Sequence, residues 1–309
     1  TLDGSGSSQG ANFTYQWTAL VDGNIIPPSN ILNPVVDEPG IYQLIVTNGQ
    51  NGCTTASTVE ISQDAASPVV QIAAPGVLNC YNSSLSLNGA GSSVGGNFAY
   101  SWSGPGIVSG GATLNPSINK PGTYTLLITN SNNNCTTVKT VNVAENIQPP
   151  AADAGADNII NCFQPQLQIG GTGSSAGPDF IYSWTGTGIV SGGNSANPIV
   201  DQPGDYTLLI TNTVNGCTAT DNVMLDFNQT APQAAAGPGF QLTCTETNYV
   251  LAPTASQGAE FTYNWSTNNG NFLTANNILT PTINGAGFYY LTVTNTINGC
   301  TATDQVQIT

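Results

Sequence analysis

Short runs of alternating apolar and polar residues recur along this chain. In the run NFAYSW every second residue is aromatic, namely Phe98, Tyr100 and Trp102. In the run TYTLLITN, the apolar residues Tyr124, Leu126 and Ile128 share one face. Glycine, proline and asparagine bound these runs, and no stretch of useful length shows the helical period of 3.6 residues. The pattern predicts short antiparallel β-strands throughout.

The same strand-turn-strand string is written four times. It reads PGIYQLIVTNGQNGCTTAST, PGTYTLLITNSNNNCTTVKT, PGDYTLLITNTVNGCTATDN and AGFYYLTVTNTINGCTATDQ. The cysteine of this string recurs after 82, 82 and 83 residues, at Cys53, Cys135, Cys217 and Cys300. Self-similarity at a fixed period is the mark of a repeat architecture, so the chain contains four repeats.

Each repeat of about 82 residues has room for about seven short strands, which favours a β-sandwich. The predicted repeats are residues 1–62 (N-terminally truncated), 63–144, 145–226 and 227–309. The stretches between them are short and rich in proline and alanine, which favours extended, semi-rigid connections. The expected fold class is therefore all-β, with four tandem immunoglobulin-like sandwiches in an extended array.

Two aromatic positions recur with the period and are predicted to be structural. The tryptophans alternate with phenylalanine on one strand face and are expected in the core, although a sugar-stacking platform is the alternative. The tyrosines follow the Pro-Gly or Ala-Gly corner and are expected to form tyrosine corners that bond to backbone. The core tryptophans are Trp17, Trp102, Trp184 and Trp265, and the corner tyrosines are Tyr42, Tyr124, Tyr206 and Tyr289.

Composition excludes several function classes. The chain holds 2 basic residues, 17 acidic residues and no histidine, for a net charge of −15. Such a surface repels phosphate backbones, which excludes nucleic acid as a partner, and no apolar run is long enough to insert in a membrane. Without histidine there is no Ser-His-Asp triad, no Cys-His pair and no histidine-ligated metal. We expect a protein that is not an enzyme.

Seven cysteines follow the same period. The repeat-start cysteines are spaced by 82 residues, so the second, third and fourth repeats each hold two cysteines and the first holds one. This arrangement predicts a disulfide inside each complete repeat, which would contribute roughly 4 kcal/mol and require an oxidising, extracellular setting. The predicted pairs are Cys80 with Cys135, Cys162 with Cys217, and Cys244 with Cys300.

Cys53 has no partner within its repeat, and two explanations remain open. By alignment of LDGSGSS with LNGAGSS, its partner would lie a few residues before Thr1 in a longer array. Alternatively, Cys53 is free to link a neighbouring chain.

With these residues in view, the chain resembles a tandem of polycystic-kidney-disease (PKD)-type domains. PPAADAGAD followed by LQIGGTGSS is similar to the opening of that family, and YSW and PGTYTLLITN are similar to its third strand and tyrosine corner. The ending TNTVNGCTAT is similar to repeats of giant surface adhesins of gliding Bacteroidota. The resemblance implies an immunoglobulin-like sandwich in a long cell-surface or secreted protein of a kind often exported by the type 9 system. The WDFGDG motif of many PKD domains is absent, and WSGPGIV or WTGTGIV stands in its place.

Asp153 and Asp157, near the junction of the second and third repeats, are the weak calcium candidates, because carboxylate oxygens at a joint could hold Ca²⁺. No other cofactor is expected. The loops after each tryptophan differ most between repeats and would carry any binding specificity.

The first functional hypothesis is the stalk or filament of a bacterial cell-surface adhesin or fibre, with neighbouring repeats or copies of itself as partners. The alternatives are an array that binds surface glycans or host or partner proteins, and a spacer region of a large secreted hydrolase.

Overall fold

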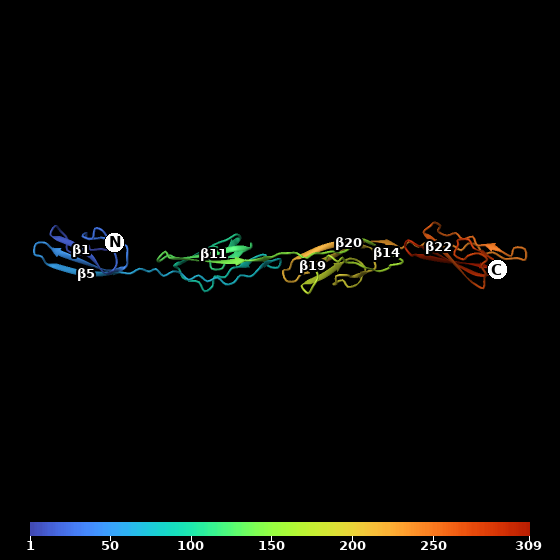
Figure 1. Ribbon diagram of the computed structural model, residues 1–309, viewed down its shortest axis with the longest axis horizontal. Coiled ribbons are helices and arrows are strands. Elements are labelled where there is room, and N and C mark those ends of the chain that lie inside the picture. The colour runs from blue at the N-terminus through green and yellow to red at the C-terminus, as the bar shows by residue number, and fades with distance from the viewer. The chain divides into compact units, whose positions relative to one another are not determined.

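The computed structural model describes all 309 residues and contains 25 strands and no helix (Figure 1). The chain divides into two compact units. Unit one comprises Thr1–Gly76 and Ser84–Ala144, and unit two comprises Val77–Ser83 and Glu145–Thr309. The all-β class and the tandem β-sandwich organisation are confirmed. The division between the two units does not coincide with a boundary between predicted repeats. The short segment Val77–Ser83 belongs by sequence to the second repeat, but its contacts place it in unit two.

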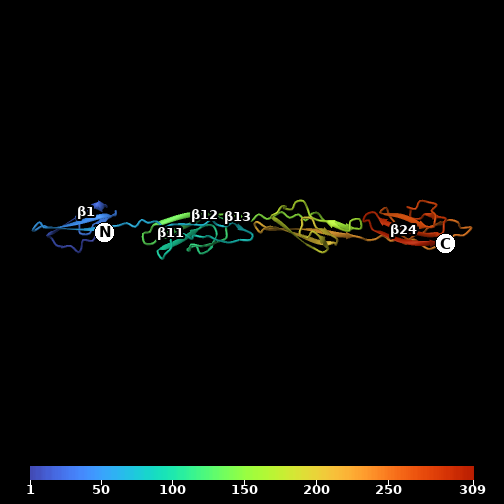
Figure 2. The same cartoon turned by 90° about the horizontal axis from the view of Figure 1, so that it is seen from below.

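Unit one holds two repeats, each built on a three-stranded antiparallel sheet in which the Tyr-containing strand is central. In Figure 2, β11 and β12 of the second repeat lie side by side, as their ladder requires. The strands of unit one are β1 (Phe13–Asp22), β2 (Ile25–Ile26), β3 (Val35–Val36), β4 (Gly40–Asn48), β5 (Thr54–Ile61), β7 (Leu85–Ser86), β8 (Phe98–Ser103), β9 (Ile107–Ser109), β10 (Ser117–Ile118), β11 (Gly122–Asn130) and β12 (Thr136–Val143).

Unit two repeats this plan twice and adds parallel pairs at the repeat ends. Its first strands are β6 (Leu78–Asn79), β13 (Glu145–Asn146), β14 (Asn158–Asn161), β15 (Leu167–Gln168), β16 (Phe180–Thr185), β17 (Ile189–Ser191) and β18 (Ile199–Val200). The others are β19 (Gly204–Asn212), β20 (Thr218–Asn228), β21 (Tyr249–Val250), β22 (Phe261–Asn268), β23 (Thr282–Ile283), β24 (Gly287–Asn295) and β25 (Thr301–Ile308).

The recurring tryptophans are core residues, as expected. All four are at most 6% exposed, and each indole N–H donates to a backbone carbonyl, from Leu32, Thr113, Ser195 and Leu279. A buried indole needs such a partner, because an unpaired buried donor is costly. No tryptophan face is therefore free for a sugar.

The tyrosine corner is also confirmed in every repeat. Each corner tyrosine is fully buried, and its hydroxyl donates to the carbonyl of the residue four positions upstream at 2.5 to 2.7 Å. The corner fixes the turn that leads into the central strand. The phenol carries this bond into the core, where water cannot replace it.

A repeat-start strand runs parallel to the end of the last strand of the same repeat. In the third repeat, β14 pairs with the C-terminal part of β20, with Asn158 opposite Leu225 and Asn161 opposite Asn228. In the fourth repeat the start segment makes the same contact by a bridge between Phe240 and Ile308. The residue that follows each repeat-start strand therefore lies beyond the end of its own sandwich.

Burial gives one corner a pH dependence. Loss of hydration raises the pKa of the Tyr206 hydroxyl above its ordinary value near 10, and the nearby Asp201 charge acts in the same direction. The neutral phenol is thus favoured in the folded state. Its stabilising effect is complete below the unfolded pKa and is lost as the pH rises through and above about 10.

We therefore expect the free energy of unfolding, measured in denaturant, to fall as the pH rises above about 10. Tyr206→Phe should be less stable at pH 7 by about 1 kcal/mol and should show a smaller fall with pH. An equal fall in the variant would show that other groups cause it.

Candidate functional site: joints between repeats

The disulfides join different repeats, so the predicted pairing within each repeat is wrong. Cys80 bonds to Cys217, and Cys162 bonds to Cys300, with Cα–Cα distances of 5.0 and 4.9 Å. The bonded residues are 137 and 138 positions apart in sequence. The predicted pairs Cys80–Cys135, Cys162–Cys217 and Cys244–Cys300 do not form.

Strand direction explains the error. Cys162 follows β14, which runs parallel to the end of β20, whereas Cys217 directly precedes the beginning of β20. The two cysteines of one repeat therefore lie at opposite ends of an 11-residue strand, roughly 35 Å apart at 3.3 Å per residue. A disulfide requires Cα atoms within about 7 Å. The cysteine beyond the end of one sandwich instead meets the hairpin of the next.

Sequence spacing could not separate the two pairings. A bond from each repeat to itself and a bond from each repeat to the following one both preserve the 82-residue period. Pairing within each repeat would leave one cysteine of this chain unpaired, whereas pairing between successive repeats leaves three. The structure shows Cys53, Cys135 and Cys244 free. Cys53, which was expected to be unpaired within this chain, is one of these three.

At the joint between the third and fourth repeats, a backbone hydrogen bond and an aromatic contact accompany the disulfide. The backbone N–H of Cys162 donates to the carbonyl of Asn298 at 2.9 Å. The ring of Phe163 lies directly over Gly299, where an added Cβ would be 2.5 Å from the ring. Any side chain at position 299 would displace the aromatic ring, so glycine makes this close contact possible.

Asn298 holds the linker at the same joint. This asparagine is 1% exposed, and its side-chain amide donates to Asn228 Oδ1 and to the carbonyl of Thr230, both at 3.0 Å. Its Oδ1 accepts the N–H of Cys300 at 2.9 Å. One buried side chain thus connects the hairpin to the linker, and every polar atom of the amide has a partner.

The same contacts recur at the other disulfide of unit two. Cys80 donates its N–H to the carbonyl of Asn215 at 2.9 Å, and the ring of Tyr81 lies over Gly216. The Asn215 amide donates to Asn146 Oδ1 and to the carbonyl of Gln148. Sequence reasoning missed both asparagines. The available signal was the conserved spacing of Asn two residues before the hairpin cysteine, which occurs in all four copies of the string.

Asp153 and Asp157 do not form a shared site. The Asp153 carboxylate accepts backbone N–H groups of Gly155 and Gly173, at 3.0 and 2.7 Å, and Asp157 accepts the N–H of Met224 at 2.8 Å. Both carboxylates thus have structural backbone partners. No group of three or more Cys, Asp or Glu side chains is arranged to hold a metal ion.

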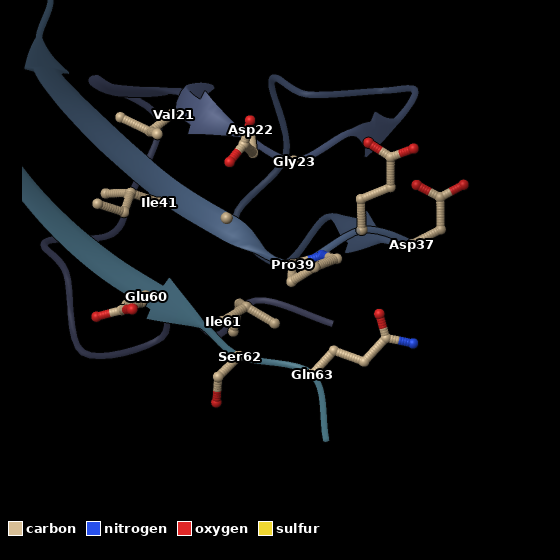
Figure 3. A pocket seen from close by; sticks show the side chains of 12 residues that line it. Val21, Asp22, Gly23, Asp37, Pro39, Ile41, Glu60, Ile61, Ser62 and Gln63 are labelled. Carbon is tan, nitrogen blue, oxygen red and sulfur yellow. The ribbon is translucent and has the colours of Figure 1, made fainter. Parts of the chain in front are cut away.

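A shallow acidic hollow of about 660 Å³ lies at one end of the first repeat (Figure 3). Four of its lining residues are acidic, and it contains no basic residue. Figure 3 shows the carboxylates of Asp22, Asp37 and Glu60 directed to different sides, and the Asn24 amide donates to Asp37 at 2.9 Å. The hollow has negative charge without converging ligands.

No helix of this chain is long and apolar enough to span a bilayer.

Comparison with known proteins gives neighbours in structure alone. No protein-family model matches the chain, and no curated protein matches it in sequence. The PKD-type identity and the likeness to Bacteroidota adhesins therefore stay predictions.

Similar solved structures include immunoglobulin domains 1–5 of Sidekick-1, at 15% identity and a TM-score of 0.30, covering 97% of this chain and 74% of that one. Drosophila N-cadherin EC1-4 matches at 12% identity and a TM-score of 0.29, covering 98% and 93%. A SusE-like surface located polysaccharide binding protein of Bacteroides thetaiotaomicron matches at 14% and 0.32, covering 98% and 69%. Scores this low carry no argument about role.

The close contact at Gly299 gives a matched pair of variants. Gly299 and Gly52 occupy the same hairpin position at φ +75° and +71°, but nothing lies within 4 Å of an added Cβ at Gly52. Gly52→Ala should cost only the backbone strain, about 1 kcal/mol, whereas Gly299→Ala should cost at least twice that.

The specific readout is the rate at which a mild thiol reduces each disulfide, followed by peptide mapping. Gly299→Ala should speed reduction of Cys162–Cys300 and leave Cys80–Cys217 in the same molecule unchanged. An unchanged reduction rate of Cys162–Cys300 in Gly299→Ala would contradict the packing of Phe163 on the hairpin.

Proposed function

We propose that this chain is a non-catalytic, extracellular structural protein that forms part of the stalk or filament of a bacterial cell-surface adhesin or fibre. The observation that carries the proposal is the double connection between the third and fourth repeats. The peptide linker runs between them, and the Cys162–Cys300 bond crosses the same joint.

A double connection suits a chain under tension. The 80–217 loop and the 162–300 loop overlap in sequence, so each bond closes a loop that contains one end of the other. In a fully unfolded oxidised chain, the shortest covalent path retains residues 1–80, 162–217 and 300–309, about half of the chain. Extension under load is limited to that path, since the disulfides bypass the remaining segments.

The disulfides and the strands that follow two of the tryptophans support the same role. Two disulfides favour an oxidising compartment, which agrees with a cell-surface location. The segments after two of the tryptophans form strands, β9 and β17, that pair into the second sheet of their repeats rather than remaining free loops. This arrangement favours a structural role over the alternative of a glycan-binding loop array.

Backbone cleavage tests the double connection. A site for a specific protease placed within residues 229–233 should give a product that stays in one piece without reductant and separates into two fragments once reduced. The same site placed within residues 63–67 is the control, because no disulfide spans that linker, and its fragments should separate without reductant. Separation of both products under non-reducing conditions would contradict the double connection.

The biological role is tested on native material. Electron microscopy with an antibody against this chain should label filaments or strings sheared from cells under non-reducing conditions. Continuous labelled filaments would indicate that the chain is the polymer's building block, and labelled strings that end at a distinct tip would indicate a stalk. Label confined to the cell interior would overturn the proposal.

A further inference from the structure

Glycine follows each of the two buried asparagines that hold the linkers of unit two. Asn215 precedes Gly216 and Asn298 precedes Gly299, and both glycines have a φ of +75°. Asn-Gly is the dipeptide in which the next backbone nitrogen most readily attacks the asparagine side chain, because glycine has no Cβ to obstruct the approach. The aromatic ring at each joint requires the same glycine. The residues that allow the joint to pack therefore also make its central asparagine chemically reactive.

In the closed joint between the third and fourth repeats, both reacting groups are engaged elsewhere. The N–H of Gly299, whose nitrogen would be the nucleophile, donates to the carbonyl of Asn295 at 2.8 Å. The Asn298 amide that would be attacked is 1% exposed, its Oδ1 accepts the N–H of Cys300, and its Nδ2 donates twice to the linker. Ring closure requires the side chain to leave all these partners. The folded joint therefore protects the amide from its own backbone.

The other disulfide-linked joint is protected in the same way. The N–H of Gly216 donates to the carbonyl of Asn212 at 2.8 Å. Asn215 is 1% exposed, its Oδ1 accepts the N–H of Cys217 at 2.9 Å, and its Nδ2 donates twice to the linker. The two joints thus hold the same reactive dipeptide in the same bonded state, so each can serve as the reference for the other.

The second repeat separates the holding contact from the reactive dipeptide. Its hairpin has Asn133 followed by Asn134. The Asn133 amide donates to the carbonyl of Ala66 in the linker at 3.1 Å, as the Asn298 amide donates to its own linker. The Cβ of Asn134 obstructs the attack that glycine permits. Asn133 is therefore a natural control for the chemistry of the sequence.

We propose that Asn215 and Asn298 are deamidation sites that react when their joint opens, and that the reaction then prevents the joint from closing. Water is the only co-reactant. Opening releases the amide to solvent and leaves the glycine N–H bonded only within an exposed hairpin tip. Local opening of this kind is an equilibrium between closed and open populations. The rate of deamidation is therefore proportional to the fraction of time that the joint is open.

The reaction at Asn298 has two steps. In the first, the Gly299 nitrogen bonds to Asn298 Cγ, the Cγ–Nδ2 bond breaks, and ammonia leaves with the proton that the nitrogen gave up through solvent. In the second, water adds to either carbonyl of the resulting succinimide and opens the ring to aspartate or isoaspartate. Each modified site gains one negative charge, and neither an oxidant nor a reductant is consumed.

The product cannot replace asparagine in the closed joint. The Asn298 Nδ2 donates to two oxygens, Asn228 Oδ1 and the carbonyl of Thr230, both at 3.0 Å. A carboxylate has no hydrogen to donate to either of them. Asn228 can turn its own amide to offer a donor, but the Thr230 carbonyl has no such alternative. Burial of an anion beside an unpaired carbonyl is costly, so the modified joint stays open.

Deamidation therefore accumulates in chains whose joints are pulled open or reduced, and it leaves closed joints intact. The inference rests on the joint contacts and not on the stalk role. It is confirmed or overturned independently of the proposed function.

The test compares the two joints within one molecule. The full chain with Cys162→Ser and Cys300→Ser loses the disulfide of one joint and keeps that of the other. After alkylation of the free thiols and incubation at neutral pH, peptide mapping by mass follows the conversion of each amide to acid. Asn298 should react about ten-fold faster than Asn215 in this variant, and both should react slowly in the unaltered oxidised chain.

Two results would overturn the protection by the joint. One is an equal rate at Asn298 and Asn215 in the double variant. The other is an equal rate at Asn298 in the unaltered oxidised chain and in the reduced chain in denaturant. The reduced, denatured chain also checks the chemistry, because Asn133 should react about ten-fold more slowly there than the two Asn-Gly sites.

Asn298→Asp supplies the reaction product directly. The variant should speed reduction of Cys162–Cys300 by a mild thiol about ten-fold, because the joint stays open. Reduction of Cys80–Cys217 in the same molecule should be unchanged, which shows that the other repeats are folded. An unchanged rate at Cys162–Cys300, or an equal increase at both bonds, would overturn the claim that deamidation holds the joint open. Either result would leave the double connection standing, because backbone cleavage tests that connection separately.

Discussion

The structure depends on the parallel pairing of each repeat-start strand with the end of the last strand of the same repeat. This pairing places the start strand over the core, where Ala154 and Ile160 are buried in the third repeat. It also directs the chain past the end of the sandwich before it turns back. The cysteine that follows is therefore outside its own domain and adjacent to the next hairpin, which decides the partner of every disulfide.

At each disulfide-linked joint, several interactions converge on one hairpin and restrict its movement. At the joint between the third and fourth repeats, the disulfide, the aromatic contact and the amide of Asn298 engage three different segments: the start strand, the hairpin and the linker. A buried amide whose donors and acceptor are satisfied tolerates little displacement, because each lost bond would leave an unpaired polar group in the interior. The disulfide keeps these groups together, and the contacts in turn limit how the joint can move.

Disulfides between repeats couple the unfolding of neighbouring repeats. A bond within one repeat would stabilise that repeat alone. A bond between repeats closes a loop of about 138 residues, for which the chain-entropy model gives roughly 5 kcal/mol, and it makes the unfolded states of neighbours dependent on each other. In the third repeat, Val223 is 1% exposed and lies in the same core as Ala154 and Ile160 of the start segment.

The sequence by itself determined the repeat period, the all-β class, the core tryptophans and the tyrosine corners. These features depend on local alternation and on residues that repeat at fixed positions, so a single chain shows them directly. The direction of the start strand depends instead on which face of the core remains to be covered, a property of the folded sandwich. Only the tertiary structure therefore decided that Cys162 meets Cys300 rather than Cys217 and that Asn298 holds the linker. Both pairings keep the same 82-residue period, and the distance between the two ends of β20 distinguishes them.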